Sequence, residues 1–133
     1  MAVPAPFDAQ NFLRLLGIDL PAPHEDRDLV ARLTVTHPLI AGTGYLWAPV
    51  VIAMADAVCA FGVSRHWPDG ATSFTTLNCQ SQFIASAQEG NEVTATAVPL
   101  HLGRTTQVWD ATVLNVSCDR LMATYRCTQL LMY

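Results

Sequence analysis

The sequence predicts an α+β domain in which one long central helix is wrapped by a curved antiparallel sheet of about five strands, with a short helix near the N-terminus. Two observations lead to this prediction. Residues 45–63 form an apolar segment whose only charge is Asp56. The second half of the chain holds four runs rich in Thr and Val, separated by turn residues. A helix that is apolar on every side must be surrounded by protein, and a curved sheet is the simplest cover for it.

The first part of the chain predicts two helices and one strand. A short helix is expected over residues 8–16, capped by Asp8 and stopped by Gly17. Residues 29–36 alternate between apolar and polar side chains, which is typical of a strand with one buried face. The central helix is expected over residues 49–65, because a proline is tolerated in the first turn of a helix.

The second part predicts four strands in an antiparallel meander. They are expected over residues 72–84, 92–100, 105–116 and 121–131. The separators contain the Gly, Asn and Asp that tight reversals require. Because five strands cover only one side of the central helix, its remaining apolar surface and the sheet edge are expected to meet a partner subunit, in a homodimer or homotetramer.

Composition indicates one domain over residues 1–133 and excludes several classes of protein. The chain is 51% hydrophobic and 14% charged, whereas an ordinary soluble domain is about 25% charged. All seven basic residues are Arg and the net charge is −4. A nucleic-acid binder needs a basic stripe, which is missing here, so nucleic acid is not expected as a partner.

The apolar segment and the cysteines bear on location. Residues 45–63 number nineteen, close to the roughly 20 that cross a bilayer. Asp56 near the middle of this segment would be costly in lipid, so we expect a helix buried in protein and no association with a membrane. The four cysteines are widely spaced and no signal-peptide pattern precedes them, which predicts reduced thiols and a cytoplasmic protein. Neither these cysteines nor the four histidines form closely spaced ligand pairs, so no metal is expected.

Four short segments carry a resemblance to a known family. They are residues 44–49 (GYLWAP), 54–57 (MADA), 89–90 (EG) and 103–106 (GRTT). With them, the chain from about residue 29 to 133 resembles the hotdog-fold acyl-CoA thioesterases of the phenylacetate-pathway and 4-hydroxybenzoyl-CoA type. The resemblance implies the hotdog fold, hydrolysis of a CoA thioester to the free acid and CoA, and no cofactor beyond the coenzyme A of the substrate.

The family pattern is only partly kept. The first segment commonly reads His-Gly-Gly, with an acid on the central helix nine residues after the His. The acid is kept here as Asp56, but Trp47, Ala48 and Pro49 stand in place of His-Gly-Gly. These replacements remove the His side chain and one backbone amide.

The resemblance implies that Asp56 and Ala48 are the catalytic pair. Asp56 either attacks the thioester carbonyl or activates a water that does so. A carboxylate in an apolar helix is costly unless it is used or paired, so the alternatives are a hydrogen bond from a backbone amide or a salt bridge to an Arg. The amide of Ala48, at the start of the helix, is the expected oxyanion donor; otherwise Ala48 is an ordinary first-turn residue.

Four residues are candidates for binding the substrate. Trp47 forms either a wall for the acyl group or part of the core at the helix entrance. Arg104, with Thr105 and Thr106, is expected to bind the phosphates of coenzyme A, since Arg matches phosphate geometry; the alternative is an unliganded loop Arg.

Two other functions stay open on the sequence. One is a hotdog-fold CoA dehydratase or hydratase that would use His37 as its catalytic His. The other is a non-catalytic acyl-CoA or lipid-binding module, which the missing family His favours.

Overall fold

The computed structural model describes residues 11–21 and 28–133. The predicted cap at Asp8 lies outside these residues. The helices are α1 (Asn11–Leu16), the 3₁₀ turn η2 (His37–Leu39) and α2 (Ala48–Arg65). The strands are β1 (Val30–Thr34), β2 (Ser73–Phe83), β3 (Glu92–Leu102), β4 (Thr106–Asn115) and β5 (Arg120–Met132).

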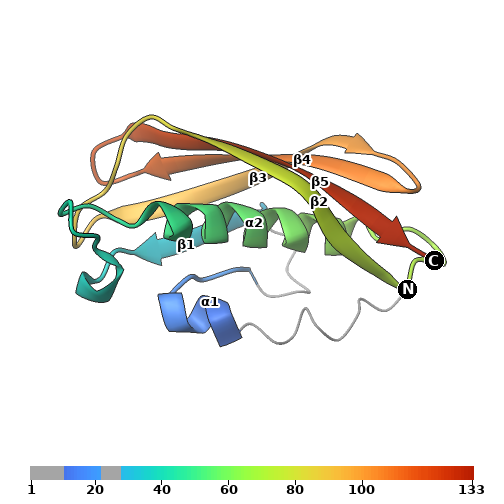
Figure 1. Cartoon of the computed structure of the whole chain (residues 1–133), viewed down its shortest axis with the longest axis horizontal. Coiled ribbons are helices and arrows are strands. Elements are labelled where there is room, and N and C mark those ends of the chain that lie inside the picture. Colours follow the sequence, from blue (N-terminus) through green and yellow to red (C-terminus); the bar gives the residue numbers. More distant parts are fainter. Residues whose placement is uncertain (1–10, 22–27) are drawn as a thin grey trace.

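The five strands form one antiparallel sheet in the order β1-β3-β4-β5-β2. The sheet curves over one side of α2, which runs across its concave face, and α1 lies on the opposite side of the helix (Figure 1). The predicted architecture of a central helix wrapped by a five-stranded antiparallel sheet is therefore confirmed.

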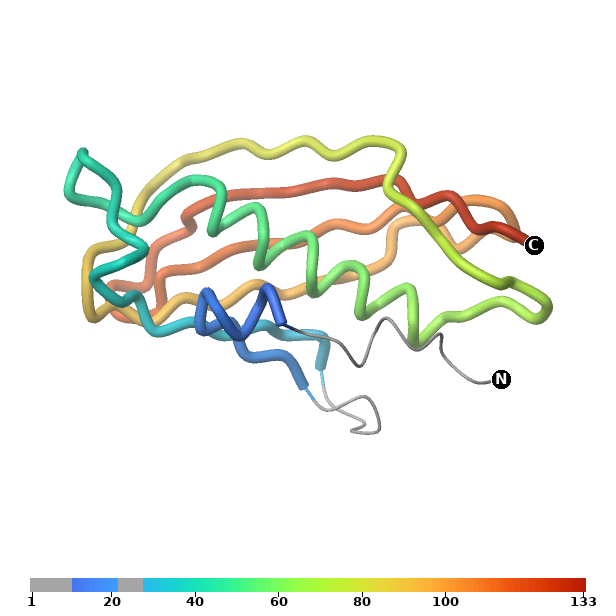
Figure 2. Tube along the Cα trace, turned by 60° about the horizontal axis from the view of Figure 1, so that its bottom comes forward, coloured from blue at the N-terminus to red at the C-terminus, as the bar shows by residue number. Residues whose placement is uncertain are grey.

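The predicted four-strand meander is wrong for β2. Only β3, β4 and β5 follow one another as neighbours, whereas β2 pairs with β5 at the far edge. Residues 84–91 cross the end of the sheet between β2 and β3 (Figure 2). Backbone bonds from Ile84 to Met122 and from Gly90 to Val35 fix this crossing, at 2.7 and 2.8 Å. Turn residues indicate where a chain reverses, but not which strand it then joins.

The core lies between α2 and the concave face of the sheet. Ten of the eighteen residues of α2 are buried, so this helix is a core helix although its length and composition alone would allow it to cross a membrane. Trp109 on β4 is fully buried against it. A Cβ atom at Gly62 would lie 2.6 Å from the Trp109 ring, so only glycine permits this close approach.

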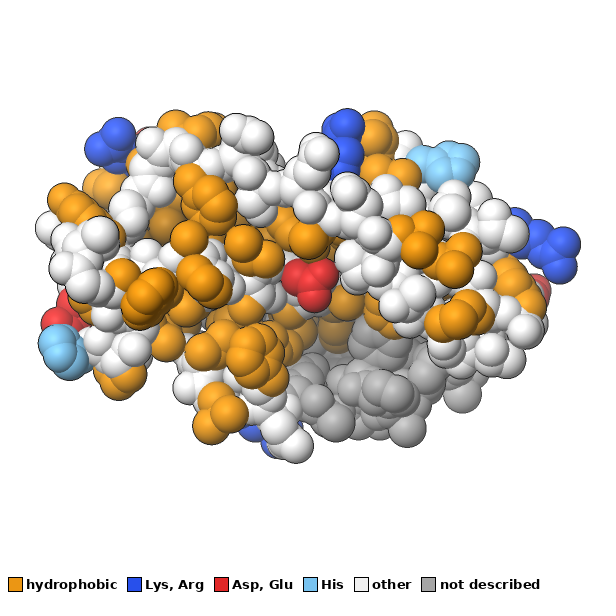
Figure 3. Space-filling model, in the orientation of Figure 1, with side chains coloured by type: hydrophobic (Ala, Val, Ile, Leu, Met, Phe, Trp, Pro, Cys, Tyr) orange, Lys and Arg blue, Asp and Glu red, His pale blue; other side chains and the backbone are white. Residues whose placement is uncertain are grey.

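One face of α2 is left only partly covered by the rest of the chain. It consists of half-buried residues at helical spacing, which we call the open face of α2: Ile52, Ala53, Asp56, Ala57 and Ala60. Hydrophobic side chains gather on this side of the molecule, with an acidic side chain among them near its centre (Figure 3). The residues that the structure describes thus do not surround the helix within a single chain.

The two edges of the sheet differ. The outer edge of β1 is covered, because Asp19 and Arg32 exchange two backbone hydrogen bonds of 2.8 and 2.9 Å. In residues 11–21 and 28–133, no segment pairs with the outer edge of β2. This strand is eleven residues long, carries no charge, and exposes Leu77 and Phe83.

Candidate active site

Asp56 lies near the middle of α2 and is held by a tyrosine of the sheet. The hydroxyl of Tyr125 on β5 donates a hydrogen bond of 2.8 Å to Asp56 Oδ1. Tyr125 is 3% exposed, whereas Asp56 is half-buried on the open face of α2. This partner is neither a backbone amide nor an Arg, which were the two structural alternatives. The arrangement fixes one carboxylate oxygen and leaves the group within reach of the surface.

The tyrosine stays a donor over the whole physiological range. Burial first, and then the Asp56 carboxylate, raise the pKa of Tyr125 well above its usual value. Its hydroxyl therefore keeps its proton and continues to orient the carboxylate. Tyr125 is therefore a positioning residue for the Asp56 carboxylate.

Removal of that hydroxyl tests this role. A hydrogen bond to a charged group contributes about 1.5 kcal/mol or more, which corresponds to about tenfold in rate. We expect Tyr125→Phe to lower kcat about tenfold and to leave KM nearly unchanged in steady-state kinetics. An unchanged kcat in the folded variant would show that the carboxylate needs no such support.

The second predicted group lies at the N-terminus of α2. Ala48 is the first residue of the helix, so its N–H has no carbonyl four residues earlier in the helix to pair with. Trp47 precedes it and is 51% exposed, so it does not belong to the core of a single chain. Beside Ala48 lies a cavity of about 350 Å³ with mainly apolar walls, formed by Leu46, Val51, Phe83, Ile84 and Met122 among others.

Within one chain, Ala48 and Asp56 do not meet. They lie eight positions apart on the helix, which corresponds to about 12 Å along the axis. An oxyanion donor must lie about 3 Å from the oxygen that it stabilises. The two groups of a single chain therefore cannot act on one thioester carbonyl.

Comparison with known proteins identifies the family. Residues 43–125, more than half of the chain, match the family model described as the thioesterase superfamily. The chain belongs to the thioesterase superfamily. It is 29% identical, over 113 residues, to a protein of Listeria monocytogenes named 1,4-dihydroxy-2-naphthoyl-CoA hydrolase, and the match covers 85% of this chain and 89% of that protein.

Solved structures confirm the fold of this thioesterase. The PaaI protein of E. coli, from the phenylacetic acid degradation operon, superposes with a TM-score of 0.81 at 22% identity, covering 97% of this chain and 89% of the other. Thioesterase HI1161 of Haemophilus influenzae gives a TM-score of 0.81 at 23% identity, covering 99% and 91%. The predicted hotdog fold and the predicted class of enzyme, a thioester hydrolase, are both confirmed.

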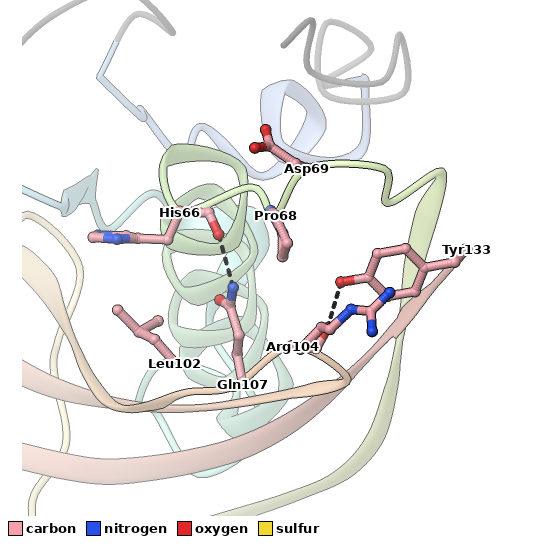
Figure 4. A pocket seen from close by; sticks show the side chains of 8 residues that line it. His66, Pro68, Asp69, Leu102, Arg104, Gln107 and Tyr133 are labelled. Carbon is pink, nitrogen blue, oxygen red and sulfur yellow. Dashed lines mark hydrogen bonds between the residues drawn. The ribbon is translucent and has the colours of Figure 1, made fainter.

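Arg104 lies at the other end of the thioesterase's central helix. It lines a cavity of about 480 Å³ together with His66 after α2, Gln107 on β4 and Tyr133 after β5 (Figure 4). The Arg104 guanidinium lies 5.2 Å from the centre of the Tyr133 ring, and the Tyr133 hydroxyl donates to the Arg104 carbonyl. His66, which lines this cavity, follows Asp56 by ten residues, and this corresponds to about 15 Å along a helix. The cavity is therefore well separated from Asp56.

Thr105 and Thr106 are held mainly by their backbones. The Thr105 carbonyl accepts from Leu131 N at 2.8 Å, and the Thr106 carbonyl accepts from Gly103 N at 2.9 Å. The bond from Gly103 closes a tight turn between β3 and β4 that presents Arg104, and the bond from Leu131 ties this turn to β5. The structure thus groups Arg104, Thr105 and Thr106 in one turn but keeps them apart from the catalytic candidates.

The remaining candidates lie elsewhere. His37 is exposed, and its Nδ1 lies 3.5 Å from Glu89 Oε2, whereas Asp56 has Tyr125 as its partner. Within one chain His37 and Asp56 are therefore not paired; the dehydratase alternative would pair them across a dimer. In the described ranges, no group of three His, Cys, Asp or Glu side chains is arranged to hold a metal ion.

The sequence analysis missed Tyr125. Alternation along β5 would have placed it on the inward face with Ala123 and Cys127, all of which are buried. Its contact with α2 depends on the register of strands that are distant in sequence, so no local pattern indicates it.

Proposed function

We propose that this thioesterase hydrolyses acyl-CoA thioesters, with Asp56 as base or nucleophile, at a site completed by a second copy of the chain. The observation that supports this most directly is the Asp56 carboxylate on the open face of α2, oriented by Tyr125. Half-burying a charged carboxylate among apolar side chains costs free energy, so such a group is a candidate for a functional role.

In this mechanism Asp56 has two possible tasks. It attacks the carbonyl carbon and forms an anhydride that water then hydrolyses, or it takes the proton of a water that attacks directly. In both cases the carbonyl oxygen gains negative charge and the thiolate of coenzyme A leaves. The amide of Ala48 stabilises that charge, and because of the 12 Å spacing estimated above it comes from the other copy.

A dimer built on β2 fits the shape of the chain. Long, uncharged edge strands are prone to pair with other strands, and β2 is such a strand. Pairing of β2 with β2 of a second copy would also bring a second sheet and helix toward the open face of α2. In light scattering we expect twice the 14.5 kDa of one chain, or a multiple of that; a folded 14.5 kDa monomer at micromolar concentration would refute the two-copy site.

The two cavities suggest how substrate binds. The apolar cavity beside Ala48 suits an acyl group, and the exposed Trp47, which precedes Ala48, could form a further wall for it. The Arg104 turn suits the phosphates of coenzyme A. The Listeria relative is named for an aromatic CoA thioester, so aromatic acyl-CoAs are the first substrates to test. A cytoplasmic location is part of the proposal and rests on the wide spacing of the four cysteines in the sequence.

The test is release of free thiol from short, long and aromatic acyl-CoAs by the purified full chain. Hydrolysis of one class with steady turnover is the expected result. A protein that binds acyl-CoA but releases no thiol from any of them would favour the non-catalytic binding module instead.

Arg104→Ala separates binding from chemistry. We expect this change to raise KM with kcat nearly unchanged, because an interaction with the coenzyme A phosphates is equally strong in the ground and transition states. Arg120→Ala, at the start of β5, is the matched control and should alter neither constant. An unchanged KM for Arg104→Ala would remove this residue from the binding site.

A further inference from the structure

The cavity beside Ala48, at the start of α2, has an apolar inner wall. This wall consists of the buried side chains of Leu46, Val51 and Met122, which are at most 5% exposed. Among the described residues that line the cavity, none carries a charge, and Ser86 alone has a polar side chain. Ser86 is exposed, so its hydroxyl belongs to the mouth of the cavity and not to the inner wall. The inner wall therefore offers an occupant apolar contacts only.

Three backbone donors of the wall are already used within the chain. The Leu46 amide donates to the Ala87 carbonyl at 2.9 Å. The Ile84 and Ala85 amides donate to the Met122 carbonyl at 2.7 and 3.1 Å. The first amide of α2, in contrast, has no carbonyl in its own helix to pair with. A carbonyl oxygen in the cavity therefore finds a donor at the α2 end.

This distribution fits an acyl group that is bound through its carbonyl. The pantetheine arm of coenzyme A carries amides and a hydroxyl, which would lose their hydrogen bonds to water against an apolar wall. An alkyl chain or an unsubstituted ring has no such bonds to lose and is stabilised by leaving water. With the thioester carbonyl at the Ala48 amide, the far end of the acyl group meets the inner wall.

Val51 is the member of this wall that is closest to Ala48 on α2. It follows Ala48 by three positions, so the two residues are neighbours on one face of the helix, with Cβ atoms about 5 to 6 Å apart. An acyl ring whose carbonyl meets the Ala48 amide can therefore extend along Val51. A hydroxyl at the far end of that ring would be buried without a partner.

We propose that this cavity selects acyl groups with an apolar far end, and that Val51 determines the selection. The inference rests on the proposed function, because it takes the Ala48 amide as the place of the thioester carbonyl. It adds a substrate class to that function. Benzoyl or alkanoyl thioesters are better substrates than their counterparts with a hydroxyl at the far end of the acyl group.

Two pairs of substrates test the selection. They are benzoyl-CoA with 4-hydroxybenzoyl-CoA, and hexanoyl-CoA with its ω-hydroxy derivative, so the members of each pair differ by one hydroxyl. In the pair that the wild-type protein hydrolyses faster, we expect kcat/KM to be about tenfold higher for the member without the hydroxyl. Equal values, or a preference for the hydroxylated member, would overturn the proposal.

Val51→Thr tests the role of this residue. Threonine has nearly the shape of valine, and in a helix its hydroxyl can donate to the carbonyl four residues earlier, here that of Trp47. The threonine oxygen then accepts a hydrogen bond from the substrate hydroxyl. We expect the tenfold preference to fall to about parity, and an unchanged preference in the folded variant would remove Val51 from the selection.

Val50→Thr is the matched control for this variant. Val50 is equally part of the first turns of α2 and is 6% exposed, but it is not among the residues that line the cavity. Its replacement should leave the preference unchanged. Thermal unfolding curves establish that both variants are folded, and the comparison of substrates in the wild-type protein does not depend on either of them.

Binding measurements separate this inference from the proposed hydrolysis. Calorimetry with Asp56→Asn gives Kd for the same four thioesters without turnover. If the wild-type protein releases no thiol, but Asp56→Asn binds the member without the hydroxyl about tenfold more tightly, hydrolysis is refuted and the selection stands. If thiol is released equally well from both members of a pair, hydrolysis stands and the selection is refuted.

Discussion

Replacement of Asp56 by Asn is expected to lower kcat by about 10² to 10⁴ in a protein that stays folded. The amide keeps the size of the side chain and an oxygen that accepts the Tyr125 hydroxyl, but it lacks the charge that attacks a carbonyl or activates water. Because Asp56 is half-buried, the neutral Asn also avoids the cost of desolvating a carboxylate. The melting temperature should therefore stay the same or rise while turnover falls.

Thiol release and thermal unfolding measured on the same preparation test this expectation. Asp110→Asn is the matched control, because Asp110 lies on the outer face of the sheet in an ion pair with Arg126, at 2.6 Å, where the guanidinium holds the pKa of the carboxyl below its usual value. Loss of the Asp110 charge in this variant should leave kcat unchanged. Wild-type turnover by folded Asp56→Asn would rule out the carboxylate mechanism.

Replacement of Ala48 by Pro should lower kcat by about 10² to 10³, the typical cost of losing one oxyanion donor. The change removes one N–H at the first position of α2, where proline fits a helix. Trp47 already has φ −57° and ψ 130°, an extended conformation that a residue before proline adopts readily. Ala48→Gly keeps the amide and should retain most of the wild-type rate.

Mixed oligomers decide whether the two groups come from different chains. Asp56→Asn and Ala48→Pro chains, carrying different tags and co-expressed, would form hetero-oligomers in which some sites combine an intact Asp56 with an intact Ala48 amide. We expect activity in these hetero-oligomers although each variant alone is nearly inactive. Hetero-oligomers as inactive as the parents would place both groups of each site in one chain, against the 12 Å spacing estimated for them.

The sequence predicted the elements well because each has a local signal. The central helix, expected over residues 49–65, is α2 (Ala48–Arg65), and the strand expected over 92–100 is β3 (Glu92–Leu102). The extra residues of β3 follow a bulge between Pro99 and His101, where the register with β4 shifts. A pattern of alternation breaks at such a bulge, although the strand continues.

What could not be predicted depends on contacts between distant segments. Asp56 stood out because a single charge in an apolar helix is costly, which is a property of neighbouring residues. Its partner Tyr125 lies 69 residues away, and the partnership exists only because β5 rather than β3 is the neighbour of β2 and passes over the middle of α2.

The difference between the two sheet edges also limits how far the molecule can assemble. A sheet with two open edges can add copies without end and grow into a filament. Here the Asp19 and Arg32 bonds cover the edge of β1, so among the described residues the long unpaired edge is that of β2. If two copies pair through their β2 edges, neither copy keeps an unpaired β2 edge. Growth by strand addition then stops at a symmetrical pair.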